Sequence, residues 1–421
     1  MDTLITSIFL GLLGISVALQ IWLSRRHIAH IAANRAQVPQ AFSSRIELPA
    51  HQKAADYTIA HQRFGLLRLA TSVVLLLGWT VFGGLDALNS ALLPLGVELG
   101  PLGYQLTLVF AFSLISGVLE LPFDWHANFR IEERFGFNRM TQRLWLADLF
   151  KNFVVSSIIG LGIAALILWL MGVAGASWWL WAWLAWVAFN LLLMVAYPLW
   201  IAPLFNKFEP LADPELKSRV EALMQRCGFS AQGLFVMDGS KRSAQSNAYF
   251  TGVGKAKRVV FYDTLLARLS HDELEAVLAH ELGHFHHRHL RKMLLGIFAA
   301  SLAGFAALGW LSGQDSFFLG LGVAPNAELP NDALAILLFL LVLPTVGPLF
   351  GPLLSQSSRR HEFEADAYAR SQASGAALAS ALVKLTEDNA STLTPDPMYV
   401  RFNYSHPPMI ERLAALEAPA T

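Results

Sequence analysis

Long apolar stretches separated by polar segments extend along most of the chain. A helix that crosses a bilayer needs about 20 mainly apolar residues, and seven stretches are long enough. They cover residues 4–23, 65–85, 103–122, 153–174, 178–204, 291–312 and 333–355. No basic segment precedes the first stretch, and Arg25 and Arg26 follow it where a signal peptide would carry small residues. We therefore interpret it as a retained span.

Basic residues are distributed unevenly between these stretches. The loops after the first and third stretches are rich in Lys and Arg, whereas the loops at 86–102, 175–177 and 313–332 contain neither. Because Lys and Arg concentrate in cytoplasmic loops, this alternation predicts an N-terminus outside and a C-terminus in the cytoplasm. The long loop at 205–290 and the segment after 356 then lie on the cytoplasmic side.

Composition supports a membrane protein. The chain is 54% hydrophobic and 15% charged, with a mean hydropathy of +0.45, whereas soluble domains are about 25% charged. A net charge of zero argues against a nucleic-acid partner. A single cysteine, Cys227, excludes an intrachain disulfide and a cysteine-based zinc site, so a bound metal would need histidine and carboxylate ligands.

The pattern divides the chain into four parts. Residues 1–204 hold the first five spans, 205–290 form a small α+β domain, 291–356 hold spans six and seven, and 357–421 form a cytoplasmic segment. Within the small domain, a helical pattern at 213–227 precedes strand-like segments at 233–237 and 258–262. The predicted fold class is a mainly α membrane protein with seven transmembrane helices and a small cytoplasmic α+β domain.

The segment His-Glu-Leu-Gly-His at 280–284 carries the clearest chemistry. On a helix, His280 and His284 share a face and can reach one cation, with Glu281 beside them. Ser270 and Glu273 predict a capping box at the start of this helix. These features indicate a zinc hydrolase, although an ordinary helix with two surface histidines would show the same five residues.

A third ligand is expected because a catalytic zinc usually has three protein ligands and one open position. Residues 358–368 follow the last span and read as a helix, on which Glu362 and Asp366 share a face while Glu364 lies about 200° away from Glu362. We select Glu362 as the third ligand and Asp366 as the carboxylate that orients a liganding histidine through its other ring nitrogen. A solvated acidic helix is the alternative.

A second histidine cluster, His286, His287 and His289, offers a competing metal site. It lies beside Arg288 and other basic residues that repel a cation. We interpret the cluster as part of the basic cytoplasmic collar of the sixth span.

Several longer motifs carry a family resemblance. They are HELGH at 280–284, EFEAD at 362–366, SKRSAQSNAYFTG at 240–252, IEERFGFN at 131–138 and SHPP at 405–408. Together they resemble the Ste24 type of integral-membrane zinc metalloprotease, the CAAX prenyl protease 1 family of M48 peptidases, over nearly the whole chain. The resemblance implies seven helices enclosing a chamber, a gluzincin-like catalytic domain and one Zn²⁺ per chain.

The resemblance also assigns roles to residues. It implies that His280, His284 and Glu362 are the zinc ligands and that Glu281 is the general base. His406 resembles the family histidine near the scissile bond, which hydrogen-bonds the substrate carbonyl. The run Asn247, Ala248, Tyr249 and Phe250 resembles the strand on which the substrate chain lies as an added strand.

The expected function is therefore peptide-bond hydrolysis by a membrane metalloendopeptidase. Alternatives are an HtpX-like stress protease, which has fewer spans, and a polytopic transporter with a structural metal, against which the few ionisable residues within the spans argue. The expected partners are the lipid bilayer and a polypeptide substrate, prenylated or membrane-associated. The absence of a dilysine retrieval signal fits a bacterial inner membrane, where removal of misfolded membrane-associated polypeptides is the expected role.

Overall fold

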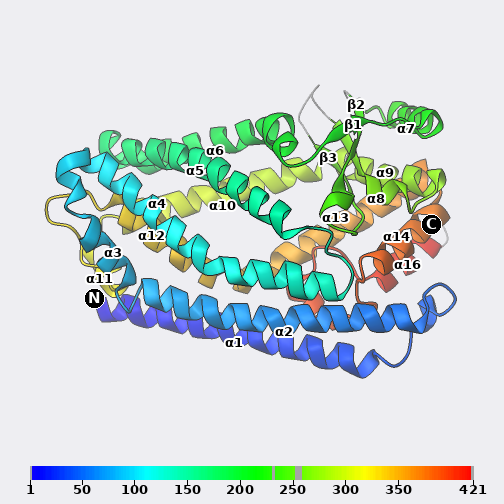
Figure 1. Cartoon of the computed structure of the whole chain (residues 1–421), viewed down its shortest axis with the longest axis horizontal. Helices are drawn as coiled ribbons and strands as arrows, with labels where there is room; N and C mark the ends of the chain where they lie inside the picture. Colours follow the sequence, from blue (N-terminus) through cyan, green and yellow to red (C-terminus); the bar gives the residue numbers. More distant parts are fainter. Residues whose placement is uncertain (1, 230–232, 252–257, 419–421) are drawn as a thin grey trace.

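The computed structural model describes residues 2–229, 233–251 and 258–418. Long helices run side by side along the longest axis, and a small sheet with short helices lies at one end (Figure 1). The N-terminus lies at the opposite end of the bundle from the C-terminus. The longer helices are α1 (Asp2–Asn34), α2 (Leu48–Trp79), α4 (Leu95–His126), α5 (Gln142–Val173), α6 (Trp178–Ala196), α10 (His289–Leu311), α12 (Asp332–Val342) and α13 (Gly351–Gln372).

The helices account for the predicted spans. Within the described ranges, five segments are long and apolar enough to cross a membrane, and two bent helix pairs raise the number to seven if each pair is one span. The single segments are Thr3–Asn34, Leu95–Glu132, Gln142–Val173, Gly175–Leu204 and His289–Leu311. The bent pairs are Leu48–Trp79 with Gly84–Leu92, and Asp332–Thr345 with Gly347–Gln372. Each of the seven predicted stretches falls in one of these segments to within one residue, which supports the predicted mainly α membrane fold.

Both bends have local causes. Between α2 and α3 (Gly84–Leu92), Gly83 has a positive φ of 74°, and a Cβ at Gly84 would lie 2.5 Å from the carbonyl oxygen of Gly78. Between α12 and α13, Pro344 and Pro348 lack the N–H that a continuous helix requires. The chain forms the short turns η8 (Leu343–Thr345) and η9 (Gly347–Phe350) there. The helix predicted at 358–368 therefore starts earlier, at Gly351, inside the predicted seventh span.

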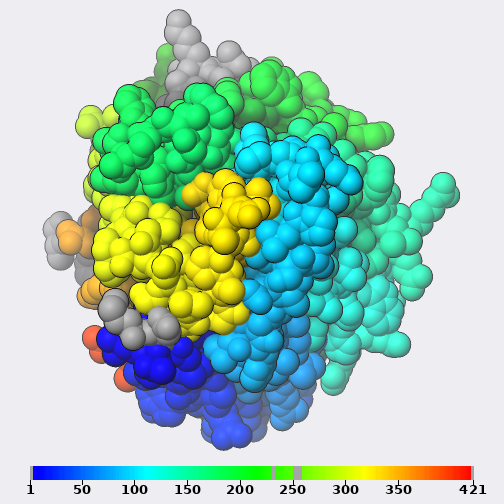
Figure 2. All heavy atoms as spheres, turned by 90° about the vertical axis from the view of Figure 1, so that its left-hand side faces the viewer, coloured from blue at the N-terminus to red at the C-terminus, as the bar shows by residue number. Residues whose placement is uncertain are grey.

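At the end of the bundle farthest from the sheet, three polar side chains form a network of hydrogen bonds. Asn89 on α3 donates to Asn326 Oδ1 at 2.8 Å, and Asn326 donates to the hydroxyl of Tyr104 at 3.0 Å. Tyr104 in turn donates to Asn89. Figure 2 shows this end, with the yellow segments that follow residue 300 packed between the blue-to-cyan helices and the green helices.

The sheet has four short strands in the order β1-β2-β4-β3. They are β1 (Phe208–Pro210), β2 (Gly233–Met237), β3 (Ala248–Thr251) and β4 (Arg258–Tyr262). β2 and β4 are parallel, while β1 pairs with β2 and β3 with β4 in antiparallel fashion. The two predicted strands match β2 and β4. The three-residue β1, which ends in a proline at the sheet edge, was not predicted.

Helix α9 lies at the centre of the extramembrane part. It packs against α7, α13 and α14, and the predicted helix at 213–227 corresponds to α7. The short helices of this region are α7 (Pro214–Arg226), α8 (Asp263–Leu266), α9 (His271–His286), α14 (Gly375–Asp388), α15 (Pro397–Asn403) and α16 (Met409–Glu417). A buried apolar cluster joins them to the sheet; its members include Leu216, Val220, Leu223, Val259, Phe261, Leu274, Leu278, Leu282, Leu378 and Leu413.

The remaining short helical segments connect these elements. They are η1 (Gln40–Phe42), η2 (Ala127–Glu132), η3 (Gly175–Ser177), η4 (Tyr197–Ile201), η5 (Ala202–Leu204), η6 (Gly239–Lys241) and α11 (Asp315–Gly320). Two of them, η2 and η4, are π-helical continuations of α4 and α6.

Candidate metal centre and active site

Helix α9 is fixed at its N-terminus by the predicted capping box. The Ser270 side chain accepts from the Glu273 N–H, and the Ser270 N–H donates to Glu273 Oε2 at 2.8 Å. Glu273 is also bound by Lys384 of α14 at 2.8 Å. The apolar face of α9 points into the core, which leaves the other face for the motif histidines; the buried residues of that apolar face include Leu274, Leu278 and Leu282.

A close approach of α9 to α13 brings the two halves of the site together. A Cβ at Gly283 would lie 2.9 Å from Ala365 Cα and 3.1 Å from Ala365 O, so any larger residue would separate the helices. This glycine, between the two motif histidines, lets Glu362 and Asp366 reach them. The contact explains why the glycine of the motif is required structurally.

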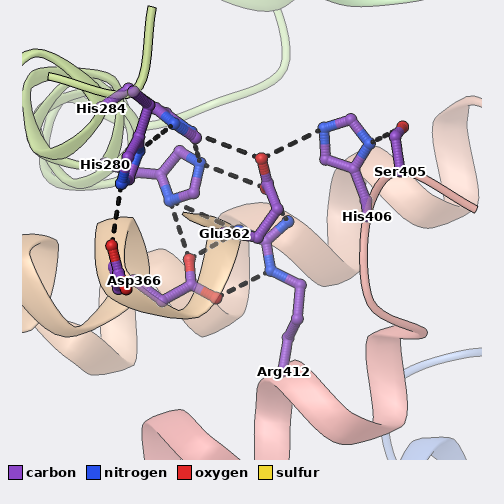
Figure 3. Close-up of polar contacts among 9 residues, drawn as sticks. His280, His284, Glu362, Asp366, Ser405, His406 and Arg412 are labelled. Carbon is purple, nitrogen blue, oxygen red and sulfur yellow. Dashed lines mark hydrogen bonds and ion pairs between the residues drawn. The ribbon is translucent and has the colours of Figure 1, made fainter. Parts of the chain in front are cut away.

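The three predicted ligands converge on one point (Figure 3). His284 Nε2 lies 3.3 Å from His280 Nε2 and 3.3 Å from Glu362 Oε1. His280 Nε2 lies 3.5 Å from Glu362 Oε2. Among the described residues, these three form the one group of His, Cys, Asp or Glu side chains with metal-ligand spacing.

The convergence fits a zinc ion. Zinc bonds of about 2.0–2.1 Å arranged as a tetrahedron separate neighbouring ligand atoms by about 3.3 Å, close to the observed distances. Glu362 Oε2 is buried and has no hydrogen-bond partner among the described residues, although buried carboxylate oxygens are almost always hydrogen-bonded. A metal ligand role accounts for this unpaired oxygen.

The outer nitrogen of His280 is held as expected. His280 Nδ1 lies 2.8 Å from Asp366 Oδ1, so Asp366 can accept its proton and leave Nε2 free as a ligand. Arg412 of α16 donates to both oxygens of Asp366 at 2.8 and 2.6 Å. It also lies 3.6 Å from Glu362 Oε2. Arg412 is buried and was missed from the sequence.

The outer nitrogen of His284 is held by a residue that sequence analysis assigned elsewhere. His284 Nδ1 lies 3.0 Å from His289 Nδ1, and His289 Nε2 lies 2.9 Å from Glu364 Oε2. His289 is only 5% exposed, so its assignment to an exposed basic collar was wrong. Arg288, at φ 56°, makes the tight turn that returns His289 toward His284.

The other two histidines of the second cluster lie outside this network. His286 stacks on the ring of Tyr368 with centroids 4.5 Å apart, and His287 meets the same ring edge-on. Neither belongs to the group with metal-ligand spacing.

The negative surroundings of the site favour a cation. Burial disfavours a charged imidazolium at His280, but the contacts with the carboxylates of Asp366 and Glu362 outweigh it and raise the pKa of His280 to about 9. Burial also raises the pKa of the Glu281 carboxyl, which makes it a stronger base than a free glutamate. The same carboxylates that hold a proton on His280 would favour a metal ion in its place.

A cavity of about 690 Å³ lies over these residues. Glu281, His280 and Glu362 form part of its wall, and the chain around His406 forms another part. Tyr57 and His61 of α2 also line it. A peptide segment entering this space would meet both the metal ligands and the general-base candidate.

His406 faces the cavity from the loop between α15 and α16. Its Nε2 lies 3.6 Å from Glu362 Oε1, and its Nδ1 lies 2.9 Å from Ser405 Oγ (Figure 3). The side chain is 66% accessible. Partial desolvation by the cavity walls lowers the pKa of the His406 imidazole. The neutral ring is therefore favoured at neutral pH.

The predicted substrate strand corresponds to β3 and the residue before it. Asn247 and Ala248 line the cavity, whereas the ring of Tyr249 contacts that of Tyr262 at 6.2 Å between centroids. Phe250 pairs through its backbone with Val259 of β4. β3 lies at the end of the strand order among the described residues, so its outer edge is open to another strand.

Comparison with known proteins covers the whole chain. Residues 27–207 match the family described as "CAAX prenyl protease N-terminal, five membrane helices", and residues 210–420 match "Peptidase family M48". CAAX prenyl protease 1 of Saccharomyces cerevisiae is 32% identical over 403 residues, which is 90% of this chain and 88% of that protein. A homolog from Oryza sativa is 36% identical over 314 residues, or 74% and 73% of the two chains.

Similarity extends to a solved structure. The crystal structure of S. mikatae Ste24p superimposes with a TM-score of 0.90 and 30% sequence identity, covering 99% of both chains. The shared fold therefore includes the membrane helices, the sheet and the C-terminal helices.

Proposed function

The chain belongs to the CAAX prenyl protease 1 family of M48 peptidases, integral-membrane zinc metalloendopeptidases, and on this basis we propose which of its residues bind the metal and which carry out the reaction. His280, His284 and Glu362 hold one zinc ion, and Glu281 is the general base. The convergence of three ligand atoms beside the half-buried carboxylate of Glu281 is the observation that carries this proposal. The similarity over 88% of the Saccharomyces cerevisiae relative and 99% of the Ste24p structure supports the Ste24 type over an HtpX-like protease or a transporter.

A zinc ion bound at these ligands would supply Lewis acidity that activates water and polarises the substrate carbonyl. Glu281 accepts the proton of the attacking water, and its raised pKa brings its basicity closer to working pH. The same carboxyl group then delivers the proton to the leaving amine. One residue thus serves as base and acid in successive steps.

His406 stabilises the charge that develops on the carbonyl oxygen. If the Ser405 hydroxyl donates to His406 Nδ1, the neutral ring carries its proton on Nε2, the atom nearer Glu362. Nε2 can then donate to the oxyanion, a contribution for which one lost donor typically costs about 10²–10³ in rate. The lowered pKa of His406 keeps this neutral form at neutral pH.

The substrate lies along the outer edge of β3 as an added strand. Backbone hydrogen bonds to the run 247–250 do not depend on side-chain identity, so varied sequences are accepted. The substrate class is therefore a polypeptide bound through its backbone, and an unlipidated peptide should be cleaved. Comparison of a farnesylated peptide with its unlipidated twin tests whether a prenyl group improves kcat/KM.

The site faces the cytoplasm, with the N-terminus outside, in the inner membrane of a bacterium. The supporting observation is the concentration of Lys and Arg in the loops on the sheet side of the bundle. Single cysteines introduced in the loops at 175–177 and 205–290 would be labelled from opposite sides by an impermeant thiol reagent. Labelling of both loops from the same side would overturn this topology.

The decisive test separates chemistry from metal binding. Glu281→Gln should keep stoichiometric zinc and lose peptide cleavage by more than about a thousandfold. Glu275→Gln, the same change on α9 at a residue paired with Arg219 and Arg226, should retain activity. Near-normal cleavage by Glu281→Gln, measured on purified protein with zinc quantified by mass spectrometry, would contradict the general-base assignment.

A further inference from the structure

Outside the metal centre, a group of contacts joins the first membrane helix to the segment that leads into the His406 loop. Asp396 precedes α15 and is 1% exposed, and His27 of α1 is fully buried against it. The Asp396 N–H donates to His27 Nδ1 at 3.2 Å. Arg26 Nε donates to both carboxylate oxygens of Asp396, at 3.0 and 2.9 Å. Two consecutive residues of α1 therefore hold a segment 369 positions away.

The same histidine also packs against aromatic rings of the α15 segment. The ring of His27 stacks on Tyr399 with centroids 4.0 Å apart and planes within 5°. It meets Tyr404 edge-on at 6.2 Å. Tyr404 lines the cavity together with Ser405 and His406. The contacts from α1 thus end one residue before the loop that faces the substrate.

The side chain of His406 has little else to fix it. Its hydrogen bond is with the neighbouring Ser405, and its ring must stay free to meet a substrate. The position of His406 is therefore set by the backbone of its loop. On one side that backbone is held by α13, because Arg359 donates to Val400 O and Tyr404 O, both at 2.8 Å. On the other side it is held by α1.

The contact with α1 carries an energetic cost. Because His27 Nδ1 accepts from the Asp396 N–H, the proton of the neutral ring is on Nε2. In the part of the chain that the structure describes, His27 Nε2 is buried and has no hydrogen-bond partner. A phenylalanine would fill the same space without an unpaired donor, so the histidine is explained by its hydrogen bond to Asp396 rather than by packing.

We propose that Arg26 and His27 are positioning residues for catalysis, which hold the His406 loop over the metal centre through Asp396, Tyr399 and Tyr404. The inference rests on the role of His406 in the proposed function. Helix α1 would then position an active-site loop in addition to spanning the membrane.

Three variants at Arg26 and His27, with Arg25→Gln as a control, test this contact. His27→Phe keeps the aromatic stack and removes the acceptor for the Asp396 N–H; Arg26→Gln removes the ion pair. Both should lower kcat by roughly tenfold to a hundredfold through displacement of His406, with KM within about twofold and zinc content unchanged. Arg26→Lys should recover most of the activity. Arg25→Gln, the same change one residue earlier, should behave as the parent.

A double-mutant cycle separates positioning from general destabilisation. If His27 acts through His406, adding His27→Phe to His406→Ala should change kcat by less than about twofold. Multiplicative losses, or a His27→Phe variant with parental kcat, would overturn the inference. If His27→Phe does not fold, the half-exposed Arg26 carries the same cycle. Retained cleavage by Glu281→Gln would instead indicate failure of the proposed function.

Discussion

The two sides of the cavity are held in different ways. On the metal side, the side chains of His280 and Glu362 are 9% and 6% accessible, and side-chain partners fix the outer nitrogens of both histidines. On the substrate side, His406 is 66% accessible, shares a hydrogen bond with its neighbour Ser405 and lies 3.6 Å from Glu362 Oε1, while β3 is at the end of the strand order among the described residues. One side is a closed network of side chains and the other is held through its backbone.

The difference follows from what each side must bind. Metal ligands need fixed positions and a fixed tautomer, which hydrogen bonds from neighbouring side chains provide. Groups that contact a substrate must keep hydrogen-bonding capacity free for it, so their positions have to be fixed by contacts of the backbone that carries them. Changes on the metal side should therefore alter metal content or stability, and changes on the substrate side should alter kcat alone.

Removal of a ligand should have the largest effect. Glu362→Ala should lose zinc and lower cleavage by more than about a thousandfold, because two histidines remain and the open position is no longer defined. Metal content by mass spectrometry and peptide cleavage measure this. Glu364→Ala, two residues along α13, should still bind zinc when zinc is saturating. Full metal retention by Glu362→Ala would indicate a different third ligand.

Removal of the buried arginine should mainly affect stability. Arg412→Leu leaves the carboxylate of Asp366 buried without its bidentate partner, and loss of one member of a buried pair typically costs about 3–5 kcal/mol. Thermal unfolding of the detergent-solubilised protein should show a lowered midpoint. Adding Asp366→Asn removes the unpaired charge and should restore part of the loss. Equal stability of the parent and Arg412→Leu would show that the pair is not needed for folding.

Loss of the partner of His284 should weaken the site without abolishing it. His289→Phe removes the acceptor at 3.0 Å from His284 Nδ1, and such changes typically cost about 10–100-fold in metal affinity. Zinc affinity follows from chelator competition, and cleavage should recover at high zinc. His287→Phe, which changes a histidine that packs on Tyr368, serves as the matched control and should bind zinc normally.

The smallest effect is expected on the substrate side. Ser405→Ala removes the hydrogen bond to His406 Nδ1, worth about 1 kcal/mol, so kcat should fall by roughly threefold to tenfold with zinc affinity unchanged. Ser391→Ala, another serine that lines the cavity, should have parental kcat. A change in zinc affinity with Ser405→Ala would show that the two sides of the cavity are not independent.

Much of the fold was predictable because local composition determines it. Apolar stretches of spanning length identify the membrane helices, and the capping box and β-branched runs identify α9, β2 and β4. The seventh span was harder, because its prolines divide one apolar stretch between α12 and α13. The strand β1, three residues that end in a proline, has too little pattern to be recognised.

In the site, the members of local motifs were predictable and the long-range partners were not. Two pairs of residues four apart, His280 with His284 and Glu362 with Asp366, each lie on one face of a helix, so their spacing in the sequence indicates that they act together. Arg412 reaches Asp366 only because α16 packs beside α13, and no spacing in the sequence encodes that contact. His289 was misjudged because its basic neighbours in sequence suggested a solvated segment, whereas the turn at Arg288, with φ 56°, returns the His289 ring to His284.

The position of Arg412 has a consequence for biosynthesis. Arg412 on α16 donates to both oxygens of Asp366 and lies 3.6 Å from Glu362 Oε2, so the side-chain network around the candidate metal ligands is complete only after residue 412 of a growing chain has been made and has folded back. Membrane helices that emerge early are thus not exposed to their own peptidase activity.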